Sequence, residues 1–199
     1  MFISALSDAV VQVILFSVIP LIWWLITARK KENFFHWLGF HKFKAGNRRQ
    51  YLIWFFGVLA GSFAVGEFAI LIRGDLSIAD SAYKGLGLAA VPSVAMYSFI
   101  QTALSEEIFF RGFLLKRLAN QFGFRTANII QASIFGVIHL LEVWGQTDFI
   151  AGAVIVIYPV VVALLLGYIN EKKSDGSVYP SWIIHGTLNT VENILQAMM

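Results

Sequence analysis

Long, predominantly apolar segments constrain the fold of this chain more than any other feature. A helix needs about 20 such residues to cross a hydrocarbon core about 30 Å thick. Five segments reach that length and a sixth is shorter and more polar, at residues 8–28, 51–72, 89–110, 126–147, 149–169 and 181–198. Because backbone amides in lipid need internal hydrogen-bond partners, such segments form helices. The sequence therefore predicts an all-α fold, a polytopic integral membrane bundle of about six transmembrane helices, with residues 1–199 in a single domain.

The composition supports a membrane protein and excludes several kinds of chemistry. Hydrophobic residues make up 58% of the chain and the mean hydropathy is +0.71, whereas soluble domains are about half apolar. The lipid bilayer is therefore the first expected partner. The chain has no cysteine, so disulfides, thiolate metal ligands and thiol nucleophiles are excluded.

The basic residues alternate between loops in a way that predicts the orientation. Seven of the 15 lie in the loop at residues 28–50, four lie in 111–125 and two follow the fifth segment, which leaves Arg73 and Lys84. Since cytoplasmic loops retain lysine and arginine, the three basic stretches are expected in the cytoplasm and both termini outside. Contact of these loops with anionic lipid headgroups accounts for the net charge of +3, and nucleic acid is not an expected partner.

The loop at residues 28–50 also contains an aromatic stretch, ENFFHWLGF. Aromatic rings are both apolar and wettable, so Phe34, Phe35, Trp37 and Phe40 are expected at the level of the lipid headgroups. The sequence thus predicts a cytoplasmic loop that lies on the membrane interface.

Two adjacent carboxylates lie inside the third apolar segment, in SEEIFFRG. Ionisable groups within a membrane segment are expected to be functional because they are costly to place there. Glu107 and Arg111 are four residues apart, which is the favourable order for a helical ion pair. Glu106 is offset by about 100° around the helix. One carboxylate can therefore be neutralised while its neighbour is free to act as a general base.

Two histidines lie in later apolar segments. His139 follows Phe135 by four residues and His185 precedes Asn189 by four, so each pair shares a helix face. These are the two of the chain's four histidines that fall within the segments, and both accompany the carboxylate pair. Glu142, three residues after His139, is a candidate for orienting that imidazole. The pattern predicts one site built from the third, fourth and sixth segments.

The order E-E-x-x-x-R, F-x-x-x-H and H-x-x-x-N resembles the three motifs of the CAAX prenyl protease and bacteriocin-processing (CPBP/Abi) family of intramembrane proteases. The resemblance covers about residues 90–197. It implies an endopeptidase that hydrolyses a peptide bond of a lipidated protein or a membrane-associated peptide, from a cavity open to the cytoplasm.

The resemblance also implies a role for each motif residue. Glu106 would activate water with His139 as its partner, and His185 and Asn189 would donate hydrogen bonds to the oxyanion. Glu107 with Arg111 would brace the helix. The compact chain, without added extensions, is similar to bacterial or archaeal members, which favours a prokaryotic plasma membrane.

Other mechanisms and functions are compatible with the same residues. Glu106, His139 and His185 are also a three-ligand zinc set with an open position, although the chain has no H-E-x-x-H motif and no cofactor is favoured. A non-catalytic membrane scaffold or bacteriocin-immunity-type protein would use these side chains only to hold helices together. A proton-coupled transporter would use Glu67, Glu106 and His139 as a relay.

Overall fold

The structure, a computed structural model, describes residues 2–43, 45–73 and 83–199. Within these ranges every regular element is helical, which confirms the predicted all-α class. Lys44 and most of the loop between the second and third segments lie outside the described residues. In chain order the helices are α1 (Phe2–Thr27), α2 (Phe34–Leu38), α3 (Arg48–Arg73), η2 (Gly87–Ala90), α4 (Val91–Met96), η3 (Tyr97–Leu104), η4 (Glu107–Leu115), α5 (Lys116–Phe122), α6 (Phe124–Glu142), α7 (Phe149–Lys173) and α8 (Tyr179–Met198).

Five of the described helical segments are long and apolar enough to cross a membrane. They are α1, most of α3, α6, α7 and a continuous run of 36 residues from Gly87 to Phe122. This run extends beyond the predicted segment 89–110 because the helix continues through η4 and α5. The predicted sixth segment is α8, a helix of 20 residues that falls short of these spans in apolarity. Its polar residues Ser181, His185 and Asn193 are buried inside the bundle.

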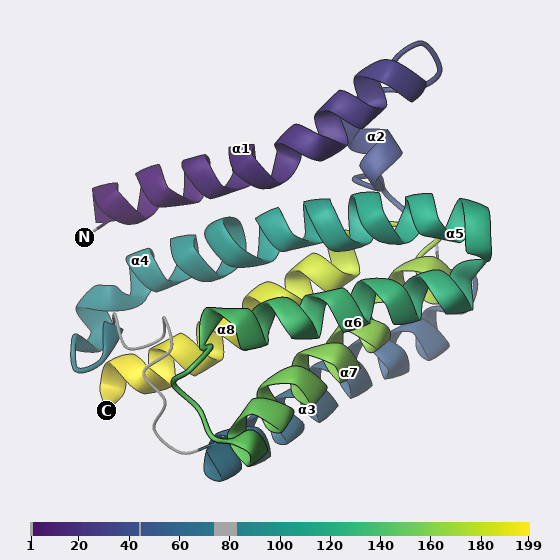
Figure 1. The fold of residues 1–199 in the computed structure, drawn as a ribbon. Helices are drawn as coiled ribbons and strands as arrows, with labels where there is room; N and C mark the ends of the chain where they lie inside the picture. The colour runs from purple at the N-terminus through teal and green to yellow at the C-terminus, as the bar shows by residue number, and fades with distance from the viewer. Residues whose placement is uncertain (1, 44, 74–82) are drawn as a thin grey trace.

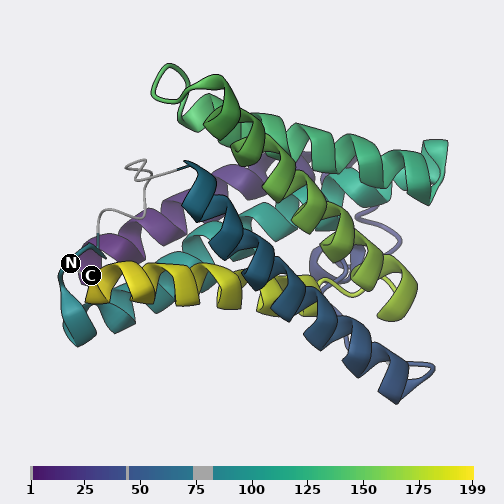
Figure 2. The same ribbon diagram turned by 90° about the horizontal axis from the view of Figure 1, so that it is seen from below.

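The chain crosses the bundle back and forth, so that both termini lie at the same end (Figures 1 and 2). The opposite end, here called the basic end, holds α2, the turn at Gly123 and the turn at residues 174–178 (Figure 1). The predicted alternation of basic loops is thus compatible with the fold, and the membrane side that each end faces stays a prediction. Arg111 is an exception: it was counted with the basic stretch 111–125, but it lies fully buried within η4 beside Glu107.

Part of the aromatic loop packs into the bundle, and its predicted level at the lipid headgroups stays a prediction. Trp37 is only 4% exposed and contacts η4, whereas Phe35 is 65% exposed. The Arg117 guanidinium lies 4.0 Å from the centre of the Trp37 ring, where the π-face attracts a cation. Gly39 ends α2 with a φ of 95°, and its carbonyl accepts the backbone N–H of Val178 at 3.0 Å. Contacts with residues far along the chain therefore decide the position of this loop.

The third span contains two widened π-helical stretches, η3 and η4, on either side of Glu106. Stretches of this kind are rare and often mark functional sites. The α8 helix packs closely on η3 at Gly186, where an added Cβ would lie 2.8 Å from Cγ of Phe99. The indole N–H of Trp182 donates to the Phe99 carbonyl at 2.7 Å across the same contact. These contacts set the spacing between the helices that carry the carboxylates and the second histidine.

Candidate active site

Residues from three of the predicted helices line a single cavity of about 530 Å³. Glu106 comes from the third span, His139 from the last turn of α6, and His185 and Asn189 from α8. The structure thus brings together all four residues that the motifs predicted to be catalytic. Their chemical roles stay predictions.

A second cavity of about 450 Å³ lies against α1. Gln12, Gln101, Glu106, Phe135, His139 and Glu142 line both cavities. Glu106 and His139 therefore lie where the two cavities meet. Glu67, a member of the alternative proton relay, lines neither of them.

The larger cavity extends toward the end of the bundle that holds the termini. Its lining includes Val143 and Gln146 from the α6–α7 turn, Glu192 and Asn193 from the last turns of α8, and Ala69 near the end of α3. Among the residues that the structure describes, no lining residue comes from the basic end. If the basic end faces the cytoplasm, the larger cavity extends toward the opposite side of the membrane. The prediction of cytoplasmic basic loops and the prediction of a cavity open to the cytoplasm then do not both hold.

Glu107 and Arg111 form the ion pair that their spacing predicted. Glu107 Oε1 and Arg111 Nη1 are 3.1 Å apart, and neither side chain is exposed. The Arg111 guanidinium also lies 4.5 Å from the centre of the Phe135 ring. A buried charge is strongly destabilising without its partner, so the pair holds η4 against its neighbours and leaves Glu107 unavailable to the cavity.

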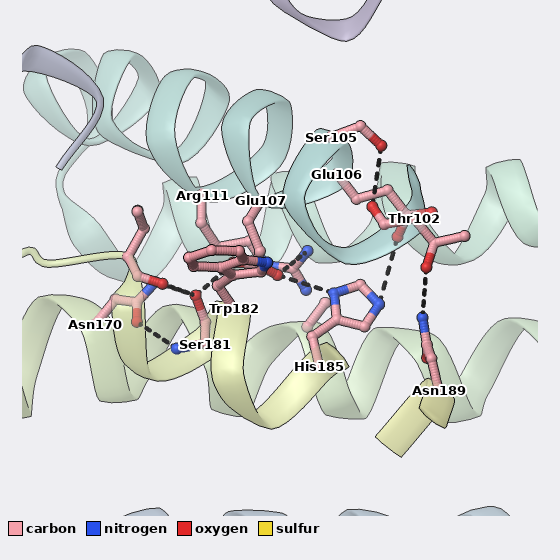
Figure 3. A network of polar contacts seen from close by, with 12 residues as sticks. Thr102, Ser105, Glu106, Glu107, Arg111, Asn170, Ser181, Trp182, His185 and Asn189 are labelled. Carbon is pink, nitrogen blue, oxygen red and sulfur yellow. Dashed lines mark hydrogen bonds and ion pairs between the residues drawn. The ribbon is translucent and has the colours of Figure 1, made fainter. Parts of the chain in front are cut away.

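His185 lies between the two carboxylates (Figure 3). Its Nδ1 is 3.1 Å from Glu107 Oε1, and its Nε2 is 3.5 Å from Glu106 Oε2. An ionised carboxylate only accepts hydrogen bonds, so Nδ1 carries the proton that faces Glu107. The other ring nitrogen faces Glu106 at ion-pair distance. Within the described part of the chain, Glu106 Oε2 has no hydrogen-bond partner.

The remaining two candidate residues are oriented by neighbours on the third span and on α6. The Asn189 amide donates to Thr102 Oγ1 at 2.9 Å (Figure 3), and because an amide has two hydrogens, one stays available to the cavity. His139 Nδ1 is 2.8 Å from the Phe135 carbonyl, which can only accept. His139 is therefore protonated at Nδ1, and in the neutral imidazole Nε2 is an acceptor.

Two buried residues of the site were missed by sequence reasoning. Ser181 donates to Glu107 Oε2, and Asn170 donates to Ser181 at 2.6 Å (Figure 3). The four-residue spacing from Ser181 to His185 places both on one face of α8 and was a usable signal. Asn170 is on α7, and no local pattern linked it to the motifs.

The alternative zinc ligands, Glu106, His139 and His185, all line the larger cavity. Among the residues that the structure describes, no group of three or more His, Asp or Glu side chains is arranged to hold a metal ion. In His185, Nδ1 is engaged by Glu107 and the other ring nitrogen faces the Glu106 carboxylate. The arrangement is that of a histidine bridging two carboxylates.

Comparison with known proteins agrees with the motif resemblance. The sequence model of the family described as type II CAAX prenyl endopeptidase Rce1-like matches residues 88–191, a range that contains all three motifs. No curated protein and no solved structure matches the chain. Because the family match covers more than half of the sequence, the chain belongs to the Rce1-like family of type II CAAX prenyl endopeptidases.

Proposed function

We propose that this protein is an intramembrane endopeptidase in which Glu106 and His139 activate water while His185 and Asn189 stabilise the oxyanion. One observation carries the proposal: these four side chains, from three helices, line one cavity. A base, an acceptor that orients water and two hydrogen-bond donors are the groups that peptide hydrolysis without a covalent intermediate requires.

The two carboxylates differ in what they can reach, which supports Glu106 as the base. The Glu106 side chain is 17% exposed and lines both cavities, whereas Glu107 is fully buried. Glu107 is also occupied by Arg111, Ser181 and His185. A general base must touch the water that it deprotonates, so Glu106 is the carboxylate available for this step.

In the proposed reaction, Glu106 takes a proton from a water molecule whose second hydrogen points to the free Nε2 of His139. The resulting hydroxide adds to the carbonyl carbon of the scissile bond, and the carbonyl oxygen becomes the oxyanion. When the C–N bond breaks, the proton held by Glu106 passes to the leaving amine. The products are a carboxylic acid, which keeps the added hydroxyl, and an amine, which takes the proton.

His185 can donate to the oxyanion only as the imidazolium, since Nδ1–H already faces Glu107 and Nε2 must also carry a proton. The Glu107 carboxylate, 3.1 Å away, accepts the hydrogen bond of Nδ1–H. Asn189 supplies the second donor through the hydrogen that Thr102 leaves free. Each such donor typically contributes about 3–4 kcal/mol to lowering the barrier.

The surroundings of the site support a substrate with an apolar part. Val11, Leu15 and Phe16 of α1 line the smaller cavity, and the first two are more than half exposed on the outer face of the bundle. A lipidated protein end or a membrane-associated peptide has the apolar surface that such walls accept. The family described above acts on peptides of this kind, which agrees with the proposal.

The test uses the full-length protein purified into lipid nanodiscs and a farnesylated peptide that ends in a CAAX sequence. Release of the C-terminal tripeptide is followed by mass spectrometry. We expect cleavage by the wild type and by Glu67→Gln, which changes a carboxylate outside both cavities, and loss of cleavage in Glu106→Gln and His139→Ala. Cleavage that survives in either of these two variants, each shown to be folded, would contradict the proposal.

A further inference from the structure

A buried chain of hydrogen bonds connects the last turn of α7 to the imidazole of His185. It runs from Asn170 through Ser181 and Glu107 to His185 Nδ1 (Figure 3). Asn170 and Ser181 are 1% and 0% exposed, and neither lines either of the two cavities described above. These two residues can therefore affect the site only through other side chains, without touching a substrate.

Asn170 holds Ser181 at two points. Its Nδ2 donates to Ser181 Oγ at 2.6 Å, and its Oδ1 accepts the Ser181 backbone N–H at 3.2 Å. Ser181 is the third residue of α8, where a helix has backbone N–H groups without intrahelical partners. Val178, which precedes the helix, makes no side-chain capping bond. Asn170 therefore caps α8 from another helix and, in doing so, fixes the serine hydroxyl.

The direction of the serine proton follows from its neighbours. Ser181 Oγ already accepts from Asn170, so its single proton goes either to Glu107 Oε2 or to the Val178 carbonyl at 3.0 Å. A bond to an ionised carboxylate is about twice as strong as one between neutral groups, so Glu107 is the acceptor. This bond holds one carboxylate oxygen in place, and the other oxygen then meets both Arg111 and His185 at 3.1 Å.

The orientation of His185 is thus determined in steps, each by a buried neighbour. Glu107 keeps a proton on Nδ1, and the plane of its carboxylate decides where the opposite nitrogen points. That nitrogen faces Glu106 across 3.5 Å. A carboxylate that orients a functional histidine is a known device in metal sites, where such partners matter almost as much as the ligands.

We propose that Asn170 and Ser181 are positioning residues, which hold His185, through Glu107, with a proton on Nδ1 and in the orientation that the peptidase step needs. The inference rests on the proposed function for its catalytic consequence. Its structural content, the protonation of His185 at Nδ1, can be measured without any cleavage.

The key variant is Ser181→Ala, because it removes the hydroxyl but keeps the backbone N–H that Asn170 caps. Its effect therefore separates positioning from capping. The second variant is Asn170→Ala, which removes both the hydrogen bond to the Ser181 hydroxyl and the acceptor of the Ser181 backbone N–H. Ser174→Ala is the matched control: this fully buried serine lies four residues after Asn170, and within the described residues its hydroxyl has no hydrogen-bond partner.

The first measurement is long-range ¹H–¹⁵N NMR on protein labelled at histidine nitrogens in nanodiscs, with the His185 signals assigned from His185→Gln. We expect protonated Nδ1 with slow proton exchange in the wild type and in Ser174→Ala. Ser181→Ala and Asn170→Ala should show faster exchange of the Nδ1 proton. A wild-type His185 with bare Nδ1, an unchanged spectrum in both variants, or an equal change in the control would overturn the inference.

The second measurement is kinetic and uses the farnesylated CAAX peptide. Ser181→Ala should lower kcat about tenfold, the lower end of losses seen when a partner that orients a functional histidine is removed, with KM unchanged. A rise in KM with unchanged kcat would contradict a positioning role. A folded wild type that cleaves no peptide would count against the proposed function, and the NMR result alone would then decide the inference about the Nδ1 proton of His185. The two failures are therefore distinguishable.

Discussion

Asn189→Ala is the most informative substitution because its effect on stability and its effect on catalysis can be separated from the structure. The Asn189 amide donates one hydrogen to Thr102 Oγ1 at 2.9 Å. Thr102 Oγ1 also lies within hydrogen-bond distance of the Tyr97 and Ser98 carbonyls, at 3.2 and 3.1 Å. When Asn189 is removed, Thr102 thus keeps an acceptor for its own proton. No buried donor is orphaned, so the free energy of unfolding should change by only about 1 kcal/mol.

The catalytic cost should be larger. Loss of one donor to the oxyanion removes about 3–4 kcal/mol of transition-state stabilisation, which corresponds to a 10²- to 10³-fold fall in kcat. KM should change little, because the interaction forms only as charge develops on the carbonyl oxygen. The matched control is Thr102→Val, which removes the anchor of Asn189 but keeps both amide hydrogens. We expect it to lower kcat by about tenfold or less.

The assay is steady-state cleavage of the farnesylated CAAX peptide in nanodiscs, with thermal unfolding of each variant measured in parallel. If Asn189→Ala lowers kcat less than threefold while remaining folded, Asn189 is not an oxyanion donor. If Thr102→Val lowers kcat as much as Asn189→Ala, the amide acts through its contact with Thr102, and the proposed role is wrong.

Three further predictions concern packing, metal dependence and topology. Gly186→Ala should lower stability by about 1–3 kcal/mol, measured by thermal unfolding, because its Cβ would clash with Phe99, whereas Gly57→Ala, which has open space around it, should be tolerated. Dialysis against a strong chelator should leave peptide cleavage unchanged, since the proposed reaction uses no metal, and loss of cleavage restored by Zn²⁺ would favour the zinc alternative. The chain has no cysteine, so Gln146→Cys and Lys31→Cys each introduce a single thiol. Each variant is treated in intact cells with a membrane-impermeant maleimide. Labelling of the first variant and not the second is expected from the positive-inside rule, and the reverse pattern would place the larger cavity toward the cytoplasm.

The arrangement of helices along the chain was predictable because each membrane segment is a local property. A run of about 20 apolar residues in lipid has to satisfy its own backbone, so its length and composition suffice to predict a helix. The Glu107–Arg111 pair was predictable for the same reason, since residues four apart meet on any helix. The boundaries were less certain: α1 begins at Phe2 and α6 ends at Glu142, whereas the corresponding predicted segments begin at residue 8 and end at residue 147.

Tertiary packing alone decided the environment of each polar side chain. Glu106 and Glu107 are neighbours in sequence, yet one lines two cavities and the other is sealed among Arg111, Ser181 and His185. Trp37 is buried against η4 and Arg117, which the sequence of its own loop did not indicate. Such outcomes depend on which side chains from distant segments fill the space between helices.

The sequence by itself determined that the chain is a helical membrane bundle and which motif residues could form a site. The tertiary structure decided that these residues share a cavity, that the cavity extends toward the termini, and that Asn170 takes part in orienting His185. The physical reason is the range of the interactions. Apolarity and helical spacing act within about one or two turns, whereas hydrogen bonds between buried groups on different helices exist only after those helices have packed.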